Sequence, residues 1–517
     1  MEDEERDLLI RAGSDNEEFT DNEDSFDSTR GNIQHDDKTN PFYEKVQFIC
    51  VGLVLCFSSA ALIILLPLYL EVVDLHGDAY TAIIFTSSTT TLGLFLVSCM
   101  CGKWGSGVRA SLVPPFTFSS VLRTGLLYGT SCFLVIYSLE RKKVICHLQD
   151  PMKGIVLVFA LVYYFFFCRK MMGLQKIFCS TTIIVGLFIS VDYGLCDEFR
   201  CRGNEREQRS EDAGDWTWQS HLVWTFVYIV GLALWSLSYT LLEGHLVIPE
   251  SFTCVGTGSS RLITVSRLVS ARDSRSTRHS CPLLQVVDER QELPSQPKQS
   301  TSSLVQRDRQ IIYMRQQYCD AEIRPRALPI ALWLHLVTLV LVVALCWTDM
   351  TSIMGKGSSA SEFWNLTRNG LYCHFGGYSK VAHSLSNEVT LNVHDTCRQV
   401  AVYAWSFLLA YIVFMFSSLK FLIVSESAVF TVAVSTTALP LAGIWWSLFR
   451  MVGGVTASTS GFLEWNPVVT GELICSILGL PIVLTGVGLL CKAYFKELSY
   501  GNVVVACLRH QEDESVG

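Results

Sequence analysis

The sequence predicts an all-α membrane protein with ten transmembrane helices, arranged as two inverted five-helix repeats. Of its 517 residues, 50 % are hydrophobic and only 17 % are charged. The apolar residues fall in blocks of about 20, which is long enough for a helix to span a bilayer. The pattern from Phe133 to Arg169 returns from Phe414 to Arg450: one apolar helix ends, a few polar residues follow, and a second apolar helix closes on an aromatic cluster and an arginine. Paired units of this kind are typical of transporters.

Ten apolar blocks define the expected helices, and a long polar segment separates the sixth from the seventh. The third block runs almost directly into the fourth, and the eighth into the ninth. Because five is an odd number, two five-helix halves would cross the membrane in opposite orientations. The blocks are Val46–Val72, Tyr80–Cys101, Phe116–Leu139, Val144–Cys168, Ile177–Val191, Leu222–Leu242, Leu328–Trp347, Val400–Leu419, Phe421–Leu448 and Val468–Tyr494.

The same blocks divide the chain into five parts. Residues 1–44 are acidic and poor in apolar side chains, so they are expected to be a disordered tail. The first half, with six helices, covers 45–243, and a Ser- and Arg-rich linker, also expected to be disordered, covers 244–326. The second half covers 327–496 and contains a long loop at 349–397, and a second tail covers 497–517.

Basic residues set the expected orientation. The loops after the second and fourth helices carry Lys103, Arg109 and Lys176 without nearby acids, and they share one side with the linker in a ten-helix chain. The positive-inside rule therefore puts the linker and both tails in the cytosol. The segment Glu140–Lys143, with three basic residues, conflicts with the rule because it falls on the outer side.

The two longer outer loops carry the features of a secretory-pathway protein. Asn365 begins a glycosylation sequon in the loop 349–397. Four cysteines in these loops are candidates for disulfides, with the pairing left open: Cys196, Cys201, Cys373 and Cys397. Free thiols and an unused sequon are the alternative.

The block from Tyr137 to Ser190, with its small-residue run Ile184–Leu187 and the later counterpart Thr485–Leu489, resembles the drug/metabolite transporter superfamily. That superfamily includes nucleotide-sugar transporters and chloroquine-resistance-type transporters, and the cysteine-bearing loop is similar to that of the latter. The resemblance covers about Lys45 to Lys496 apart from two loops. The resemblance implies two five-helix halves that enclose a cavity, and transport by alternating access. The long linker is a departure, because the compact members of the superfamily have no such segment.

Polar side chains in the fourth helix are the first candidates for solute binding or proton coupling. His147, Gln149, Asp150 and Lys153 lie in its outer part, and residues three apart share a helix face. Charged groups within spanning helices usually face a cavity or a partner. An Asp150–Lys153 ion pair that only stabilises the helix is the alternative.

Further candidates lie in the ninth and sixth helices. Ser425 and Glu426 are expected in the first turns of the ninth helix, where a carboxylate would alternatively serve as a cap. Ser435 and Thr436, followed by Pro440, would either interrupt that helix near a ligand or bond back to their own backbone. Tyr239, near the end of the sixth helix, would line the cavity or anchor the membrane interface.

No motif in the sequence indicates catalysis. The chain has no nucleophile elbow, phosphate loop or zinc-ligand spacing, so we expect no enzyme, no cofactor and no metal site. It also lacks a basic, aromatic-laced surface for nucleic acid. An intramembrane transferase with a scattered site remains an alternative.

The first tail contains a sorting pattern, because Glu4, Leu8 and Leu9 match the acidic dileucine signal that clathrin adaptors bind. This favours an endosomal, lysosomal or Golgi membrane, with the plasma membrane as another location. Together the observations predict a transporter of a small organic solute, proton-coupled or not, with membrane lipid as its other partner. The alternative is a non-transporting scaffold or receptor that acts through its linker and tails.

Overall fold

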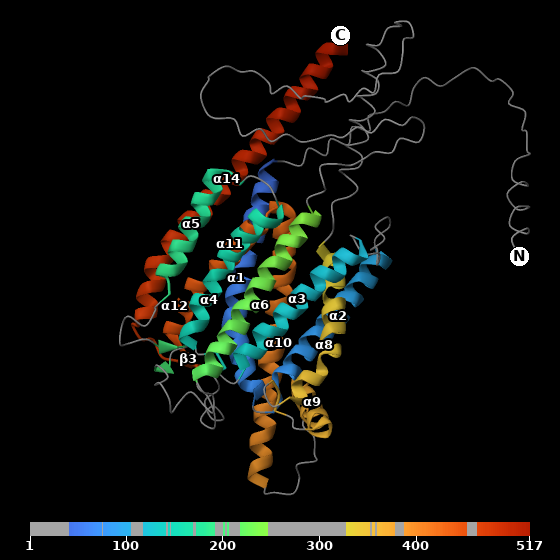
Figure 1. Ribbon diagram of the computed structural model, residues 1–517, viewed down its shortest axis with the longest axis vertical. Helices are drawn as coiled ribbons and strands as arrows, with labels where there is room; N and C mark the ends of the chain where they lie inside the picture. The colour runs from blue at the N-terminus through green and yellow to red at the C-terminus, as the bar shows by residue number, and fades with distance from the viewer. Residues whose placement is uncertain are drawn as a thin grey trace, which may run out of the picture. The chain divides into compact units, whose positions relative to one another are not determined.

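The computed structural model (Figure 1) describes residues 41–74, 76–104, 117–140, 143–144, 146–168, 172–191, 200–201, 204–205, 218–246, 327–351, 354–356, 359–377, 387–451 and 463–516. Within them the chain is helical apart from short turns and two small antiparallel hairpins. The hairpins pair β1 (Arg200–Cys201) with β2 (Asn204–Glu205), and β3 (Phe449–Met451) with β4 (Leu463–Trp465). The all-α class predicted from the sequence is confirmed.

Each of the ten predicted blocks contains a helix. The helices are α1 (Pro41–Asp74), α2 (Ala79–Trp104), α3 (Phe118–Leu139), α4 (Cys146–Tyr163) with the π-helical turn η2 (Tyr164–Cys168), α5 (Leu174–Ile189), α6 (Trp218–Leu246), α8 (Ala327–Ala344) with the 3-10 turn η3 (Cys346–Met350), α9 (Ala360–His374), α10 (Asn387–Ser425), α11 (Ala428–Thr436), α12 (Ala438–Leu448) and α14 (Gly471–Val516).

The helices have the length and surface of membrane spans. In the described part of the chain, eight segments are long and apolar enough to cross a bilayer, and two shorter apolar helices cover Met152–Phe167 and Leu174–Ile189. Large apolar side chains on these helices are exposed, among them Phe166 at 74 %, Phe178 at 67 % and Phe226 at 65 %. Apolar surface of this extent needs lipid or a partner to cover it. The chain is therefore a multi-pass helical membrane protein.

Successive long helices run in alternating directions (Figure 1). α1 and α3 finish, and α2 begins, at the end of the bundle where α9 lies; we name this the α9 end. α6 and α10 finish, and α8 begins, at the opposite end, which we name the linker end.

Several predicted boundaries are wrong. α10 continues through Leu419 and Phe421 to Ser425, because apolar residues continue across the expected break. α6 continues to Leu246, past the predicted start of the linker, and α14 continues past Tyr494 to Val516. The loop 349–397 contains the end of η3, all of α9 and the first residues of α10.

Glycines let α5 and α14 approach closely. A Cβ atom on Gly186 would lie 2.8 Å from the backbone nitrogen of Val483, and one on Gly486 would lie 2.6 Å from Cγ1 of Ile183. A Cβ on Gly479 would lie 2.6 Å from the carbonyl oxygen of Gly186. Small residues at a helix contact are the usual means of close packing in membranes. The runs Ile184–Leu187 and Thr485–Leu489, which the sequence pairs by pattern, thus belong to helices in direct contact.

Candidate functional site

The predicted polar group on the fourth helix is only partly described. Gln149 is buried, and its side-chain amide donates to the carbonyl oxygen of Val144 at 2.8 Å. Lys153 is half-buried. His147 and Asp150 lie in α4, but their side chains are outside the described part of the structure. The proposed His147–Asp150–Lys153 arrangement therefore stays a prediction.

Glu426 does not lie in the first turns of a helix, as the sequence suggested. It occupies the turn between α10 and α11 with φ of 49°, and its side chain is exposed. Ser425 ends α10, and its hydroxyl donates to the carbonyl oxygen of Ser427 at 3.4 Å. The Ser427 side chain caps α11 by accepting from the backbone amide of Phe430 at 3.3 Å.

A buried glutamate, not Glu426, is the acid at this helix start. Glu243 is only 2 % exposed, and its Oε2 accepts from the backbone amide of Ala428 at 2.7 Å. Glu243 lies within α6, because that helix runs one turn further than the predicted end at Leu242. A carboxylate at a helix N-terminus is stabilised by the unpaired amides and the helix dipole there.

The span that contains Ser435 and Thr436 is interrupted. α11 ends at Thr436 and α12 begins at Ala438, and 83 % of this span is buried, more than of any other described span. The hydroxyls of Ser435 and Thr436 both donate to their own helix, to Val432 and Ala433 at 2.9 Å. The structure thus shows both an interruption and back-bonding, and a ligand at the interruption stays a prediction.

Tyr239 lines a pocket toward the linker end of the bundle. The pocket lies between α3, α6, α8 and α10, and its lining is Thr124, Tyr128, Ser238, Tyr239, Leu242, Leu334, His335, Met415 and Leu419. Tyr239 is 5 % exposed, and its hydroxyl donates to Oγ of Ser418 at 2.8 Å. No carboxylate, lysine or arginine is among these lining residues.

A second hydrogen-bond chain crosses the wall of this pocket. The hydroxyl groups of Tyr128 and Tyr411 are 2.9 Å apart, and the Tyr411 hydroxyl is 2.9 Å from Nε2 of His335. Nδ1 of His335 is 2.8 Å from the carbonyl oxygen of Ala331. The sequence drew no attention to Tyr128, His335 or Tyr411, because single polar residues in apolar helices carry no motif.

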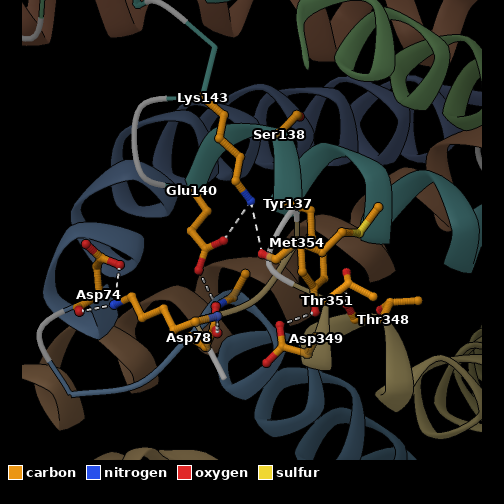
Figure 2. A network of polar contacts seen from close by, with 12 residues as sticks. Asp74, Asp78, Tyr137, Ser138, Glu140, Lys143, Thr348, Asp349, Thr351 and Met354 are labelled. Carbon is orange, nitrogen blue, oxygen red and sulfur yellow. Dashed lines mark hydrogen bonds and ion pairs between the residues drawn. The ribbon is translucent and has the colours of Figure 1, made fainter. Parts of the chain in front are cut away.

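At the α9 end a buried ion pair joins segments that are distant in the sequence (Figure 2). Lys143 is fully buried, and its Nζ lies 3.0 Å from Oε2 of Glu140 and 3.2 Å from the carbonyl oxygen of Met354. Its ammonium also lies 4.5 Å from the centroid of the Trp224 ring. The other carboxylate oxygen of Glu140 accepts from the backbone amide of Ala79 at 2.9 Å.

More polar contacts extend this arrangement. Tyr137 donates to Oδ1 of the buried Asp349 at 2.9 Å, and the backbone amide of Lys356 donates to Oδ2 of Asp78 at 2.9 Å. The Lys356 ammonium pairs with Oδ1 of Asp74 at 2.6 Å. We call Asp74, Asp78, Tyr137, Glu140, Lys143, Asp349, Met354 and Lys356 the α9-end network (Figure 2).

The network accounts for one of the three basic residues that conflict with the positive-inside rule, since Arg141 and Lys142 lie outside the described residues. Lys143 is a buried member of an ion pair with Glu140 and not a loop charge facing water. Glu140 and Lys143 lie three residues apart just after the end of α3, and this spacing was the sign of an ion pair that the sequence offered. Burial could not be inferred from it, because the partners on α2 and after η3 are far away in the sequence.

Cys373 and Cys397 form a disulfide that ties α9 to α10, with a Cα–Cα distance of 4.6 Å. His76 lies beside them, and its ring nitrogen and the two sulfurs fall within 4.8 Å of one another. Among the described residues this is the one group with metal-ligating atoms so arranged, and the disulfide occupies both sulfurs. Cys196 lies outside the described residues, as does the side chain of Cys201.

The remaining sequence candidates have mixed positions. Asn365 is exposed on α9, whereas Thr367 of the same sequon is buried. Glu4, Leu8 and Leu9 lie outside the described residues.

His374 holds α9 against the bundle through both ring nitrogens. Nδ1 donates to the carbonyl oxygen of Gly370 at 2.6 Å, so Nε2 accepts from the Tyr69 hydroxyl, also at 2.6 Å. Trp405 donates to the backbone carbonyl of His374 at 3.0 Å. Burial lowers the pKa of His374 to about 4, and burial with the nearby Lys356 also lowers the pKa of His76.

Acidification is therefore expected to loosen α9. Because the folded protein favours the neutral ring, His374 contributes its full stabilisation above about pH 6.5. That stabilisation is lost as the pH falls toward 4, where the ring must gain a proton. Between pH 7 and pH 5 the loss at His374 is about 2 kcal/mol. Detergent-unfolding free energies at the two pH values would measure it. A His374→Gln variant should show a smaller pH difference than His76→Gln; equal differences would contradict this assignment.

No protein-family model matches this chain, and a search of curated proteins found no match either.

Proposed function

We propose that this chain is a secondary transporter that moves a small organic solute across an organelle membrane by alternating access. One observation carries the proposal: a buried polar network ties the two predicted halves together at the α9 end, which we infer is closed, while a pocket between helices of the same halves lies toward the linker end. A closed end and a pocket at the other end are what one state of an alternating-access carrier requires.

The network connects the halves directly. If the halves divide after the fifth span, Tyr137, Glu140 and Lys143 belong to the first, and Asp349 and Lys356 to the second. The Tyr137–Asp349 and Lys356–Asp74 contacts then join one half to the other. So does the bond from Nδ1 of His221, in α6, to the carbonyl oxygen of Lys143 at 2.7 Å. Opening this end would break these contacts together.

The pocket is well separated from the network along the same helices. α3 contributes Thr124 to the pocket and ends at Glu140 in the network. At 1.5 Å per residue, these positions are about 24 Å apart along the axis. A solute in the pocket would thus be separated from the α9 end by most of the length of α3.

Helix pairing supports the inverted-repeat arrangement and the likeness to the drug/metabolite transporters. α2 contacts α8, α4 contacts α11, and α5 contacts α14. In each pair the second helix is five spans after the first. Exchange of two equivalent halves would map each of these pairs onto itself, as a pseudo-twofold axis requires.

Chemistry at the two ends supports the orientation. The disulfide and the exposed Asn365 lie at the α9 end, where an oxidising lumen would permit both modifications. Lys176 near the start of α5 lies toward the linker end, as the positive-inside rule asks. The pocket would then face the cytosol, and the acidic dileucine pattern favours an endosomal or lysosomal membrane.

Uptake into proteoliposomes tests transport. The purified full-length chain would be offered a whole-cell metabolite extract, with contents read by mass spectrometry. We expect one compound class to be enriched over protein-free vesicles. Lys356→Met removes a partly exposed ion pair and the bonds from the same ammonium to the carbonyl oxygens of Asp74 and Gly77. This weakens the closed α9 end, so the uptake rate should change about fivefold.

Lys420→Met, an exposed lysine on α10 outside the network, is the matched control and should transport normally. No enrichment by protein that is folded and correctly inserted would sink the proposal and favour the scaffold or receptor function. Product formation in detergent, where no second compartment exists, would instead indicate an intramembrane transferase.

A further inference from the structure

The hydrogen bonds around the pocket toward the linker end determine whether its polar groups can donate to a ligand or only accept from it. Four hydroxyl groups line it, on Thr124, Tyr128, Ser238 and Tyr239. Three of them donate their hydrogen elsewhere. Thr124 donates to Ser120 O at 2.9 Å, Ser238 to Trp235 O at 2.7 Å, and Tyr239 to Ser418 Oγ at 2.8 Å.

The direction of the fourth bond follows from a backbone carbonyl. Because Ala331 O can only accept, Nδ1 of His335 carries a hydrogen. In the neutral ring Nε2 must then accept, and its partner at 2.9 Å is the Tyr411 hydroxyl. Tyr411 has thereby used its only hydrogen, so its oxygen accepts from Tyr128. All four hydroxyl oxygens are left with lone pairs only.

A ligand of this pocket must therefore donate hydrogen bonds. Among the described lining residues an anion, or any group that only accepts, would meet no free donor, and these residues include no lysine or arginine. An ammonium group only donates. The Tyr239 ring, 4.7 Å from the Trp235 ring, adds an aromatic face of the kind that attracts cations. In this conformation the space suits about one water molecule, which is the size of an ammonium head group.

A proton on His335 would reverse the chain. With both ring nitrogens protonated, Nε2 donates to Tyr411, Tyr411 donates to Tyr128, and the Tyr128 hydrogen points away from its former partner. Tyr128 would become a donor, and the imidazolium would repel a cation. The titratable groups near this chain are Tyr128 and Cys132 of α3, Tyr239 of α6 and Tyr411 of α10. From α2, Thr91 contributes a hydroxyl to the His335 carbonyl, at 3.3 Å.

We propose that the pocket binds the ammonium group of an organic amine, and that a proton on His335 excludes it, so that amine and proton exchange. The inference rests on the proposed transport function and names its substrate class and its coupling residue. The candidates for proton coupling from the sequence, His147, Asp150 and Glu426, have no part in it.

Binding to the purified full-length chain in detergent tests the ligand class. The probes are 2-phenylethylamine, its trimethylated ammonium analogue and 3-phenylpropionate, which share one skeleton. The amine should bind, the analogue without N–H should bind about tenfold more weakly, and the carboxylate should not bind. Tyr128→Phe and Tyr239→Phe should each weaken amine binding about tenfold. Tyr372→Phe, an exposed tyrosine on α9, should leave it unchanged.

The pH dependence tests the exclusion. Amine affinity should fall as the pH is lowered and His335 gains a proton. In His335→Gln, whose amide oxygen can accept from Tyr411, binding should persist without that fall. Carboxylate binding, unchanged affinity in both tyrosine variants, or a full pH effect in His335→Gln would overturn the inference. If the protein takes up another class of solute and the Tyr128→Phe variant transports it normally, the amine inference is overturned and the transport function still stands. If amines bind but no solute is taken up, the proposed transport function is overturned.

Discussion

Replacing Lys143 by methionine is expected to destabilise the folded chain by about 3 to 5 kcal/mol. Glu140 is only 2 % exposed, and the substitution would leave its carboxylate buried without the ammonium 3.0 Å away. It would also remove the donor to Met354 O and the cation that lies against Trp224. The free energy of unfolding by a denaturing detergent, compared with the native chain, measures this loss.

A double variant separates the buried charge from the packing. In Glu140→Gln with Lys143→Met, the glutamine oxygen can still accept from Ala79, and no charge is left without a partner. We therefore expect the double variant to be more stable than Lys143→Met alone. Lys420→Met, which changes the same residue type at an exposed position, should have little effect. Equal losses for Lys143→Met and Lys420→Met would show that the ion pair does not matter for the fold.

The second large effect is expected from the disulfide. Cys373 and Cys397 are 24 residues apart, and the chain-entropy model gives about 3 to 4 kcal/mol for closing a loop of that length. Replacing both by serine should lower the unfolding free energy by that amount and free α9 from α10. Limited proteolysis should then cut within 375–400 faster than in the native chain.

Cys50→Ser is the matched control, because Cys50 is an exposed free thiol on α1. It should leave both stability and proteolysis unchanged. If the double serine variant and Cys50→Ser unfold alike, the two sulfurs are not bonded in the protein as purified. Mass spectrometry of unreduced peptides would report the bond directly.

The spans could be predicted from the sequence because hydrophobicity along the chain decides them. Their ends could not, because capping by distant groups decides where a span stops. Ser427 and Glu243 together start α11, so the break falls after Ser425 and not at Lys420. α9 carried a readable signal that was missed: Ser359 and Glu362 have capping-box spacing, and the Ser359 side chain accepts from Glu362 N at 3.3 Å.

The candidate site was less predictable than the fold. Tyr239 was named from its position near a helix end, and it does line the described pocket. Its hydrogen-bond partner Ser418 lies on α10, and the bonded pair His335 and Tyr411 joins α8 to α10, so only tertiary packing brings these residues together. The charge of Lys143 was visible in the sequence, but its burial depends on Met354, more than 200 residues away.

The two oxygens of Glu140 have a consequence for the rate at which the α9 end can open. One oxygen holds Lys143 and the other holds the first amide of α2. The amide of Ala79 keeps a second acceptor in Oδ1 of Asp78 at 2.7 Å. A partial movement that separates Glu140 from Lys143, however, leaves two opposite charges buried and apart, so halfway structures are high in energy. Opening should therefore occur as one abrupt transition between long-lived closed and open states, and single-molecule records would show two distance levels with few intermediate values.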